Sequence, residues 1–328
     1  MNVGIIGAGF FGEKHAQALA HIDDLKLVAV CRTHAAEVHA FAARYGGTPY
    51  DDPHALLADP RVDAVVIATP HATHVALVEA AAASGKHVLL EKPMAPTREG
   101  CRRIQAAVAR ARVTLRVGHV TQFSRAYRIA KEMLDAGELG DVVAGEATMR
   151  KRWYEPNRRP WHQDRALGGG VLLTGGVHAI DRLTWLVGAR ATRVSATVGT
   201  RFHDQDADDA AVIFIRYDNG AAGVVFSVGY ARGAPRHDTE LTCTRGVLRV
   251  DSVAGVTVGS DEAWHAVPDS GHPAWMDDAL VEQWRAFVAA VAGRGGGVTG
   301  AFAMHVMDVL FAAEASAAAG REVDVVAD

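Results

Sequence analysis

VGIIGAGFFG, residues 3–12, decides the architecture of the first part of this chain. The apolar run Val3–Ile6 has the composition of a buried strand, and a GxGxxG pattern follows it without a gap. A helical pattern over residues 12–21 begins at the last glycine. In such a unit the first glycine permits a tight turn, the second lets the backbone approach a pyrophosphate, and the third lets the helix pack closely. The stretch therefore predicts a Rossmann dinucleotide-binding unit, with the phosphates at the positive end of the helix.

The following residues continue this alternation of strand and helix. It is typical of a parallel, doubly wound sheet with helices on both faces, which belongs to the α/β class. The expected strands are 3–6, 26–31, 63–68, 87–90 and 114–117, and the expected helices are 12–21, 35–45, 53–58, 73–84 and 100–111. We expect residues 1–120 to form one dinucleotide-binding domain.

After Gly118 the pattern changes to longer strands. The expected strands are 142–152, 194–200, 210–217, 221–228, 239–244 and 246–251, and the expected helices are 126–136, 277–292 and 301–319. Hairpin-type turns such as Asp218-Asn219-Gly220 predict a mainly antiparallel sheet with one face open. We expect residues 121–328 to form an α+β domain for substrate binding and oligomerisation. An exposed sheet face favours a homodimer or homotetramer.

The composition is typical of a globular cytoplasmic protein. The chain has 328 residues, 49% of them hydrophobic, and a net charge of −4. This length favours two domains, and the small net charge gives no reason to expect a nucleic acid or a membrane as partner. The N-terminus lacks the basic flank of a signal peptide, and no apolar run approaches the roughly eighteen residues of a membrane span.

Metal sites are not expected. The three cysteines are widely spaced and form no CxxC pair, which argues against a disulfide framework and against thiolate ligands. The acidic stretch 203–209 lacks regular ligand spacing and lies between two expected strands, so we expect a solvated loop there. His71 and His74 lie within the segment that we assign below to the cofactor.

The end of the second expected strand bears on the choice between NAD and NADP. An acidic residue about 20 positions after the glycine motif accepts hydrogen bonds from the ribose 2′-hydroxyl, whereas an arginine accommodates a 2′-phosphate. Arg32 stands 20 residues after Gly12 with no acid beside it, and Thr33 offers a hydroxyl. A guanidinium suits a phosphate, so NADP is favoured and NAD is the alternative. A solvated surface arginine is the other interpretation of Arg32.

Two further blocks carry, with the glycine motif, a resemblance to a known family. The first comprises ATPHATH (68–74) and GKHVLLEKP (85–93), and the second is GGGVLLTGGVHAID (168–181). They resemble the Gfo/Idh/MocA oxidoreductases, relatives of glucose–fructose oxidoreductase and inositol dehydrogenase. The resemblance covers essentially the whole chain, including the C-terminal EAS…GREV pattern (314–323). It implies an NAD(P)-dependent dehydrogenase or reductase that acts on CH–OH groups.

Lys92 is the first expected catalytic residue. It lies just past the carboxyl end of an expected strand, where open α/β sheets bind ligands. A lysine beside a cationic nicotinamide ring has a lowered pKa and can exchange protons. Pro93 fixes the turn, and the resemblance implies a cis Lys92–Pro93 bond. The alternative is a surface lysine, against which position and motif both argue.

His178 is the second expected catalytic residue. Thr174 and His178 are four positions apart and share one helix face. The resemblance places an aspartate at position 174 and a histidine at position 178, so the histidine is kept and the acid is lost. A histidine can take the hydroxyl proton as hydride leaves, whereas a threonine can only orient a group. We assign proton transfer to Lys92 and His178, positioning of the substrate to Thr174, and a supporting place near the substrate to Asp181.

The resemblance also assigns residues to the cofactor. Glu91 resembles the glutamate near the nicotinamide ribose, and residues 69–74 resemble a segment that lines the cofactor. For His74 a surface histidine at a helix N-terminus is the alternative. The expected cofactor-binding residues are Gly7, Gly9, Phe10, Phe11, Gly12, Arg32, Thr33, Thr69, Pro70, His74, Glu91 and Lys92.

A basic and aromatic segment precedes the second block. It comprises RKRWY (150–154) and RRPWH (158–162). Aromatic faces stack on sugar rings and arginines bind carboxylates, so Arg152, Trp153 and Trp161 form an expected wall for a polyhydroxylated substrate, including an anionic polyol or a cyclic diol. An inter-subunit contact is an equal alternative. His119, after the last Rossmann strand, is a weaker candidate for substrate contact.

Three hypotheses of function follow. The leading one is hydride transfer between a nicotinamide cofactor, with NADP favoured, and a secondary alcohol or ketone of a sugar, cyclitol or related cyclic diol. The second is NAD-dependent glycoside hydrolysis or elimination through a transient oxidation, against which Arg32 argues. The third is a non-catalytic dinucleotide-binding regulator. Thr174 favours this third hypothesis, whereas Lys92 and His178 oppose it.

Overall fold

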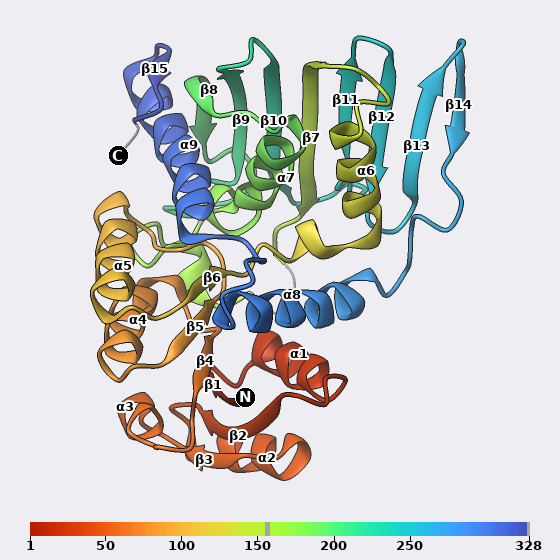
Figure 1. Cartoon of the computed structure of the whole chain (residues 1–328). Helices are drawn as coiled ribbons and strands as arrows, with labels where there is room; N and C mark the ends of the chain where they lie inside the picture. Colours follow the sequence, from red (N-terminus) through yellow and green to blue (C-terminus); the bar gives the residue numbers. More distant parts are fainter. Residues whose placement is uncertain (155–157, 327–328) are drawn as a thin grey trace. The chain divides into compact units, whose positions relative to one another are not determined.

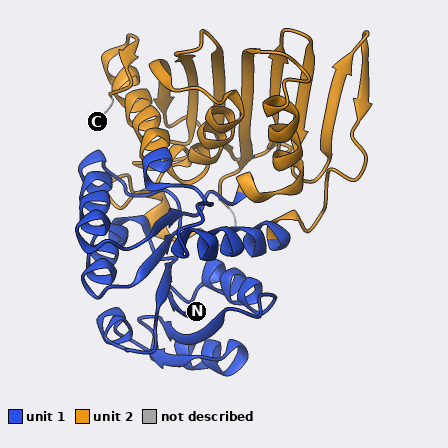
Figure 2. Cartoon of the chain, in the orientation of Figure 1, with its two compact units in different colours: residues 1–120, 277–303 blue, residues 121–276, 304–328 orange. Residues whose placement is uncertain are grey.

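The computed structural model describes residues 1–154 and 158–326 (Figure 1). The chain forms two compact units, residues 1–120 with 277–303 and residues 121–276 with 304–328 (Figure 2). The first unit therefore also includes residues 277–303, which lie between two segments of the second unit in the sequence.

The first unit contains a parallel sheet of six strands within the described residues, in the order β3-β2-β1-β4-β5-β6. These strands are β1 (Asn2–Ile6), β2 (Lys26–Cys31), β3 (Thr48–Tyr50), β4 (Ala64–Ile67), β5 (His87–Leu90) and β6 (Leu115–Val117). The order reverses between β1 and β4, as in a doubly wound dinucleotide-binding sheet. The expected Rossmann sheet is thereby confirmed. Strand β3 was not expected, because three residues that include a proline give no alternating pattern.

Helices cover both faces of this sheet. They are α1 (Phe10–Leu19), α2 (Ala35–Tyr45), α3 (Pro53–Leu57), α4 (His74–Ala83) and α5 (Arg98–Ala111), with a 3-10 turn, η1 (His71–Thr73), before α4. In Figure 1, α1 and α2 lie on one side of the sheet and α3, α4 and α5 on the other. All four residues of β4 are buried as a result. Helix α8 (Trp275–Val291) contributes to this unit, where Asp277 pairs with Lys14 of α1 at 2.8 Å.

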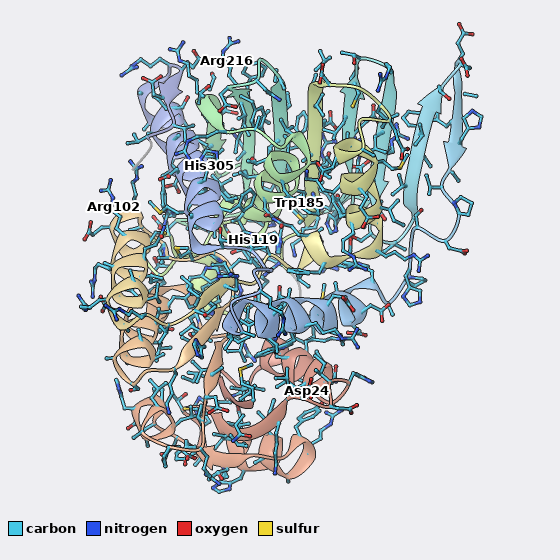
Figure 3. The ribbon with its side chains drawn as sticks, viewed as in Figure 1. Asp24, Arg102, His119, Trp185, Arg216 and His305 are labelled. Carbon is cyan, nitrogen blue, oxygen red and sulfur yellow. The ribbon has the colours of Figure 1, made fainter. Side chains whose placement is uncertain are left out.

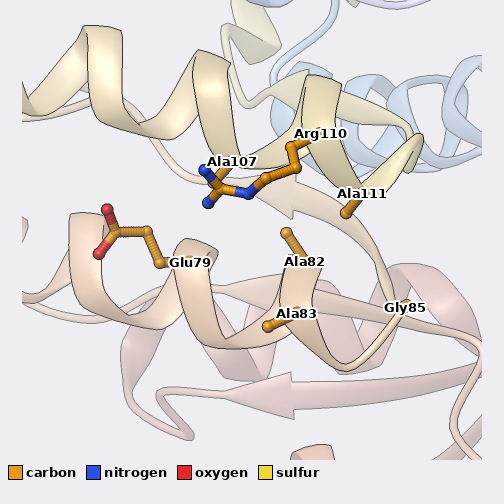
Figure 4. A pocket seen from close by; sticks show the side chains of 7 residues that line it. All are labelled: Glu79, Ala82, Ala83, Gly85, Ala107, Arg110 and Ala111. Carbon is orange, nitrogen blue, oxygen red and sulfur yellow. The ribbon is translucent and has the colours of Figure 1, made fainter.

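A shallow groove lies between α4 and α5 (Figure 4). Its volume is about 320 Å³, and it is lined by Glu79, Ala82, Ala83, Gly85, Ala107, Arg110 and Ala111. The groove is at the C-terminal ends of both helices, hence at the amino ends of the strands that follow them. Ligands of open α/β sheets bind at the opposite, carboxyl ends. The small residues here serve the close packing of two helices.

The second unit contains a sheet of nine strands within the described residues, in the order β14-β13-β12-β11-β7-β10-β9-β8-β15. They are β7 (Val142–Arg152), β8 (Ala191–Gly199), β9 (Ala210–Tyr217), β10 (Ala222–Tyr230), β11 (Thr239–Cys243), β12 (Gly246–Asp251), β13 (Gly255–Ser260), β14 (Ala263–Ala266) and β15 (Val323–Asp324). Only β7 and β10 pair in parallel among these, so the expected mainly antiparallel sheet is confirmed. Strands β13, β14 and β15 were not expected, because β14 and β15 have only four and two residues and the two valines of β13 are flanked by glycines.

Helices lie on one face of the second sheet (Figure 1). They are α6 (Arg125–Asp135), α7 (Val177–Val187) and most of α9 (Gly300–Ala319), with the short turns η2 (Val120–Phe123), η3 (Pro160–Gln163) and the π-helical turn η4 (Leu172–Gly176). Burial alternates along β10, where Val225 is fully buried and the neighbouring Phe226 is only partly buried. The opposite face of the sheet is therefore the open one.

Helix α9 is the one described helix that is long and apolar enough to cross a membrane by length and composition. However, 61% of its most apolar window is buried inside the protein. Val306, Val309 and Leu310 have no exposed surface. This helix is a buried core helix.

Candidate active site

The glycine loop has the backbone geometry that the motif predicts. Gly7 has φ +102°, and a Cβ there would lie 2.4 Å from the backbone oxygen of Ala68. A Cβ on Gly12 would lie 2.3 Å from the oxygen of Gly7. A Cβ on Gly9 would meet no protein atom within 4 Å. Gly7 and Gly12 are thus required by the fold, whereas Gly9 leaves space at the N-terminus of α1 for a phosphate group.

Arg32, at the end of β2, lies against this loop. Its Nη1 donates a hydrogen bond to the backbone oxygen of Ala8 at 2.8 Å. Its Nη2 forms an ion pair with the carboxylate of Glu37, in the first turn of α2. Thr33, next to it, is exposed. No acidic residue adjoins Arg32 in the sequence, but the fold of α2 places the Glu37 carboxylate against it.

His74, at the start of α4, holds two loops together. Its Nδ1 lies 3.0 Å from the backbone oxygen of Pro93, and its Nε2 lies 3.1 Å from that of Thr69. The side chain is fully buried, which lowers its pKa and is incompatible with a surface histidine. A neutral imidazole carries one N–H, so it donates to one of these two oxygens and lies against the other. His74 thus packs between the segment after β4 and the turn after β5. Thr69 is partly exposed and Pro70 is exposed beside it.

The turn after β5 contains Glu91, Lys92 and Pro93, with the cis Lys92–Pro93 bond that the resemblance implies. Glu91 is 6% exposed, and its Oε1 lies 3.0 Å from Nε2 of His15 on α1. Its Oε2 accepts a hydrogen bond from the backbone N–H of Lys92 at 3.3 Å. Glu91 therefore connects the helix of the glycine loop to the backbone of Lys92.

Trp284 fixes the hydrogen bonding of His15. The indole Nε1 of Trp284, on α8, donates to Nδ1 of His15 at 3.1 Å, and both side chains are fully buried. An indole N–H is only a donor, so Nδ1 of His15 must be an acceptor. The ring proton then resides on Nε2, which donates to Glu91. The result is a directed chain of hydrogen bonds from Trp284 through His15 to Glu91.

Two residues after β6 complete this side of the first unit. A Cβ on Gly118 would lie 2.8 Å from Oε1 of Glu91, so the carboxylate needs a glycine there. His119 (Figure 3) is 1% exposed. Burial, and then the charge of Lys92, lower the pKa of His119 to about 3. His119 is therefore a neutral imidazole at physiological pH and cannot pair as a cation with an anionic substrate.

In the second unit, Thr174 and His178 lie one helical turn apart. Thr174 lies in the π-helical turn η4, and His178 lies in the first turn of α7. Within residues 171–180 these two are partly exposed and the other eight are buried. A π-turn widens the helix only slightly, so positions four apart still face nearly the same way. The block therefore leaves only these two side chains partly exposed, although Oγ1 of Thr174 and Nδ1 of His178 are themselves buried.

Asp181 lies one turn further along α7. It is fully buried, and its Oδ1 accepts a hydrogen bond from Nε2 of Gln122 at 2.6 Å. Burial raises the pKa of Asp181 from 3.8 to about 8. The carboxyl group is thus protonated near neutral pH and supports the helix from inside.

Asp181→Asn is expected to change the pH dependence of stability. The folded chain holds a proton on Asp181 that the unfolded chain releases above pH 3.8, so stability declines as the pH rises from about 4 to about 8. An asparagine stays neutral and still accepts from Gln122. Between pH 5 and pH 8 the free energy of unfolding in urea should fall by about 3 kcal/mol more in the wild type than in the variant. Parallel curves for the two proteins would contradict this assignment.

The acidic stretch 203–209 is a loop built on two buried carboxylates. The Asp209 carboxylate accepts hydrogen bonds from the backbone N–H groups of residues 201–203 at 2.6 to 2.9 Å. Asp208 accepts one from Leu172 at 2.8 Å, and burial raises the pKa of Asp208 to about 7. The expectation of a solvated loop is wrong for these two residues. No group of three or more candidate metal ligands occurs in the described part of the chain.

Of the three residues expected to contact the substrate, Arg152 and Trp161 are accessible and Trp153 is buried. Trp153 is fully buried, donates from Nε1 to Oε1 of Gln205 at 2.9 Å, and carries the Arg158 guanidinium 4.4 Å from its ring centre. Its ring therefore offers no face to a sugar. Arg152 is exposed, and Trp161 is partly exposed and stacks on His162 at 3.7 Å.

Comparison with known families assigns both parts of the chain. Residues 1–119 match the oxidoreductase family with an NAD-binding Rossmann fold, and residues 127–249 match the GFO/IDH/MocA C-terminal domain. The chain belongs to the Gfo/Idh/MocA family of oxidoreductases. The resemblance found in the sequence is confirmed, and the protein is an NAD(P)-binding oxidoreductase of this family.

Several relatives match over most of the chain. The rhizopine catabolism protein MocA of Rhizobium meliloti is 31% identical over 96% of this chain and 93% of its own length. Myo-inositol 2-dehydrogenase of Thermotoga maritima is 30% identical over 79% of this chain and 77% of its own length. Among solved structures, GenD2 from gentamicin A biosynthesis in complex with NAD is 28% identical, with a TM-score of 0.88, and the match covers 100% of this chain and 97% of that chain.

Sequence reasoning missed three residues at this site, namely His15, Glu37 and Trp284. His15 follows Gly12 by three positions, which is a signal of a helix face but not of a partner. Glu37 follows Arg32 by five positions across a strand–helix junction. Trp284 is 269 residues from His15 in the sequence, so no local pattern could connect the two.

Proposed function

We propose that this enzyme transfers hydride between a nicotinamide cofactor, with NADP favoured, and a secondary alcohol or ketone of a sugar, cyclitol or related cyclic diol. The observation that carries the proposal is the turn of Glu91, Lys92 and Pro93. Two buried histidines, His15 and His74, hold it at the carboxyl ends of the strands. Such rigid placement is expected of a lysine that must meet a reacting group.

The residues divide the chemistry as follows. NAD(P) supplies the hydride acceptor or donor at nicotinamide C4. Lys92 and His178 hold and return the proton of the substrate hydroxyl, which is general acid–base work. Thr174 has no ionisable group, so it orients the hydroxyl by a hydrogen bond. Gly9 and the N-terminus of α1 receive the pyrophosphate.

The substrate class rests on accessibility and on relatives. Trp161 and Arg152 keep exposed surface suited to a ring and to an anionic group. The relatives named for myo-inositol and rhizopine support a cyclitol or a related polyol. We place the enzyme in the cytoplasm, with no membrane or nucleic-acid partner.

A substrate screen tests this function. The purified full chain is mixed with NAD or NADP and a panel of inositols, aldoses and cyclic dihydrodiols, and the absorbance of reduced nicotinamide is followed. We expect cofactor reduction with at least one class. Tight NADH binding without turnover in either direction would favour the alternative that the protein is a non-catalytic, dinucleotide-binding regulator. Cleavage of a glycoside without net cofactor change would favour the transient-oxidation mechanism.

We also propose that the open face of the second sheet joins two copies of the chain. Its central strands present an apolar row that the helices do not cover, consisting of Val212, Phe214, Val224, Phe226 and Val228. Arginines flank the row, with Arg216 (Figure 3) over Phe214 at 5.2 Å and Arg150 over Phe226 at 4.5 Å. A face that mixes aromatic and arginine side chains is typical of an interface.

Val212→Glu is expected to convert the oligomer into monomers, because it places a charge in the centre of the apolar row. Val212 is 40% exposed, so the folded chain tolerates the change. The measurement is molar mass by light scattering after size exclusion. Val253→Glu, at a valine that is 53% exposed in the turn between β12 and β13, is the matched control and should leave the mass unchanged. A wild-type monomer, or an unchanged mass in Val212→Glu, would contradict this interface.

A further inference from the structure

The ion pair between Arg32 and Glu37 stands at the point where dinucleotide sites read the adenosine ribose. Two contacts fix the guanidinium: Nη1 donates to the backbone oxygen of Ala8, and Nη2 pairs with Glu37. The first contact holds Arg32 against the glycine loop, at the end of β2. The residue after β2 in this fold contacts the ribose 2′ position. The arginine that would receive a 2′-phosphate therefore already has an anionic partner.

Both side chains of this pair are accessible. The Arg32 side chain is 31% exposed and that of Glu37 is 50% exposed. A 2′-phosphate carries nearly two negative charges at neutral pH, which Arg32 attracts and Glu37 repels. A 2′-hydroxyl is neutral and can donate a hydrogen bond to a carboxylate, which is how acidic residues recognise NAD. The two side chains thus favour opposite forms of the cofactor.

Further carboxylates lie close to the same strand end. Asp51 and Asp52 follow β3, which pairs with β2 through Tyr50 and Cys31. Burial, and then the charges of Asp52 and Asp51, raise the pKa of the Cys31 thiol to about 11. The end of β2 is therefore not a strongly cationic pocket.

We infer that Glu37 determines cofactor specificity by holding Arg32 in an ion pair, which limits the preference for a 2′-phosphate so that the enzyme accepts both NAD and NADP. This inference rests on the proposed dinucleotide site. Glu37 acts through Arg32 and through its own charge at the 2′ position. An enzyme with Arg32 alone would prefer NADPH strongly.

The test measures the affinity of the full chain for NADPH and NADH by nucleotide fluorescence, so it does not require a substrate. In Glu37→Gln, the Kd for NADPH should fall about tenfold relative to the Kd for NADH, since a repulsion between nearby surface charges is removed. In Arg32→Ala, the Kd for NADPH should instead rise about tenfold relative to the Kd for NADH. The gain in Glu37→Gln should shrink at high salt, because these charges are exposed.

A matched control separates the local effect of the Glu37 charge from the effect of the net charge of the protein. Glu138→Gln removes one exposed carboxylate after α6, in the second unit, and should leave both affinities unchanged. An unchanged NADPH-to-NADH ratio in Glu37→Gln would overturn the inference while nucleotide binding itself persists. Failure of the wild type to bind either nucleotide would instead overturn the proposed function and the inference with it. A ratio that changes equally in Glu138→Gln would also overturn it, because net charge alone would then explain the effect.

Discussion

Lys92→Met is expected to lower kcat for cofactor reduction by about a thousandfold while NADH still binds, since general acid–base groups contribute on the order of 10²–10⁴. Methionine has nearly the length of lysine but neither a charge nor a transferable proton. The buried contacts that hold the turn come from its neighbours, because His15 binds Glu91 and His74 binds the Pro93 oxygen. The turn should therefore keep its shape, and the loss should appear in kcat.

The control for this variant is Lys26→Met, at an exposed lysine that begins β2. It makes the same substitution in the same sheet and should retain full activity. Binding of NADH, measured by fluorescence, separates loss of chemistry from loss of the site. Cofactor reduction at an undiminished rate in Lys92→Met would refute the role of the lysine.

A second readout follows from the position of His119. The charge of Lys92 contributes, after burial, to the low pKa of His119. Removing that charge should raise the pKa of His119, which nuclear magnetic resonance of the imidazole can follow. A structural lysine far from His119 would have no such effect, so the shift reports the proximity of the two groups.

Local geometry explains which parts of the site the sequence could predict. The roles of Gly7 and Gly12 follow from one strand–turn–helix unit, and the structure has the close approaches that the motif requires. The shared exposure of Thr174 and His178 follows from helix periodicity alone. Both inferences use residues within one or two turns of each other, where backbone geometry leaves few alternatives.

Contacts between distant segments explain what the sequence could not predict. Trp153 has the composition of a sugar-binding residue, but its indole N–H finds Gln205 and its ring is covered by the fold. Glu37 becomes a partner of Arg32 only when α2 folds back beside β2. Asp208 is buried and accepts a hydrogen bond from Leu172, 36 positions earlier. No periodicity in the sequence carries such information.

The largest effect on stability is expected at His15, because it stands between two buried groups. In His15→Leu the carboxylate of Glu91 and the indole N–H of Trp284 both lose their partner. Removing one partner of a buried charged hydrogen bond costs about 3–5 kcal/mol. We expect the free energy of unfolding in urea to fall by about 3 kcal/mol, and NADH binding to weaken because Glu91 no longer holds the backbone of Lys92.

His15→Gln distinguishes positioning from proton transfer. A glutamine has one acceptor and one donor, so its oxygen can accept from Trp284 and its amide can donate to Glu91. The glutamine thus keeps the same pattern of one accepted and one donated hydrogen bond as His15, but its side chain cannot ionise. We expect stability within about 1 kcal/mol of the wild type and most of the activity. Lost activity in His15→Gln with stability and NADH binding kept would show instead that the histidine acts in proton transfer.

Trp284→Phe tests the direction of the same chain from its other end. Phenylalanine keeps most of the buried ring but donates no hydrogen bond, so the imidazole proton of His15 is no longer confined to Nε2. With the proton on Nδ1, Nε2 becomes an acceptor that faces the Glu91 carboxylate and no longer holds it. NADH binding in this variant should then be weaker than in the wild type. Unchanged NADH binding would mean that Trp284 contributes packing alone, whereas weaker binding in a variant that stays folded would show that the indole N–H sets the tautomer of the imidazole beside Glu91.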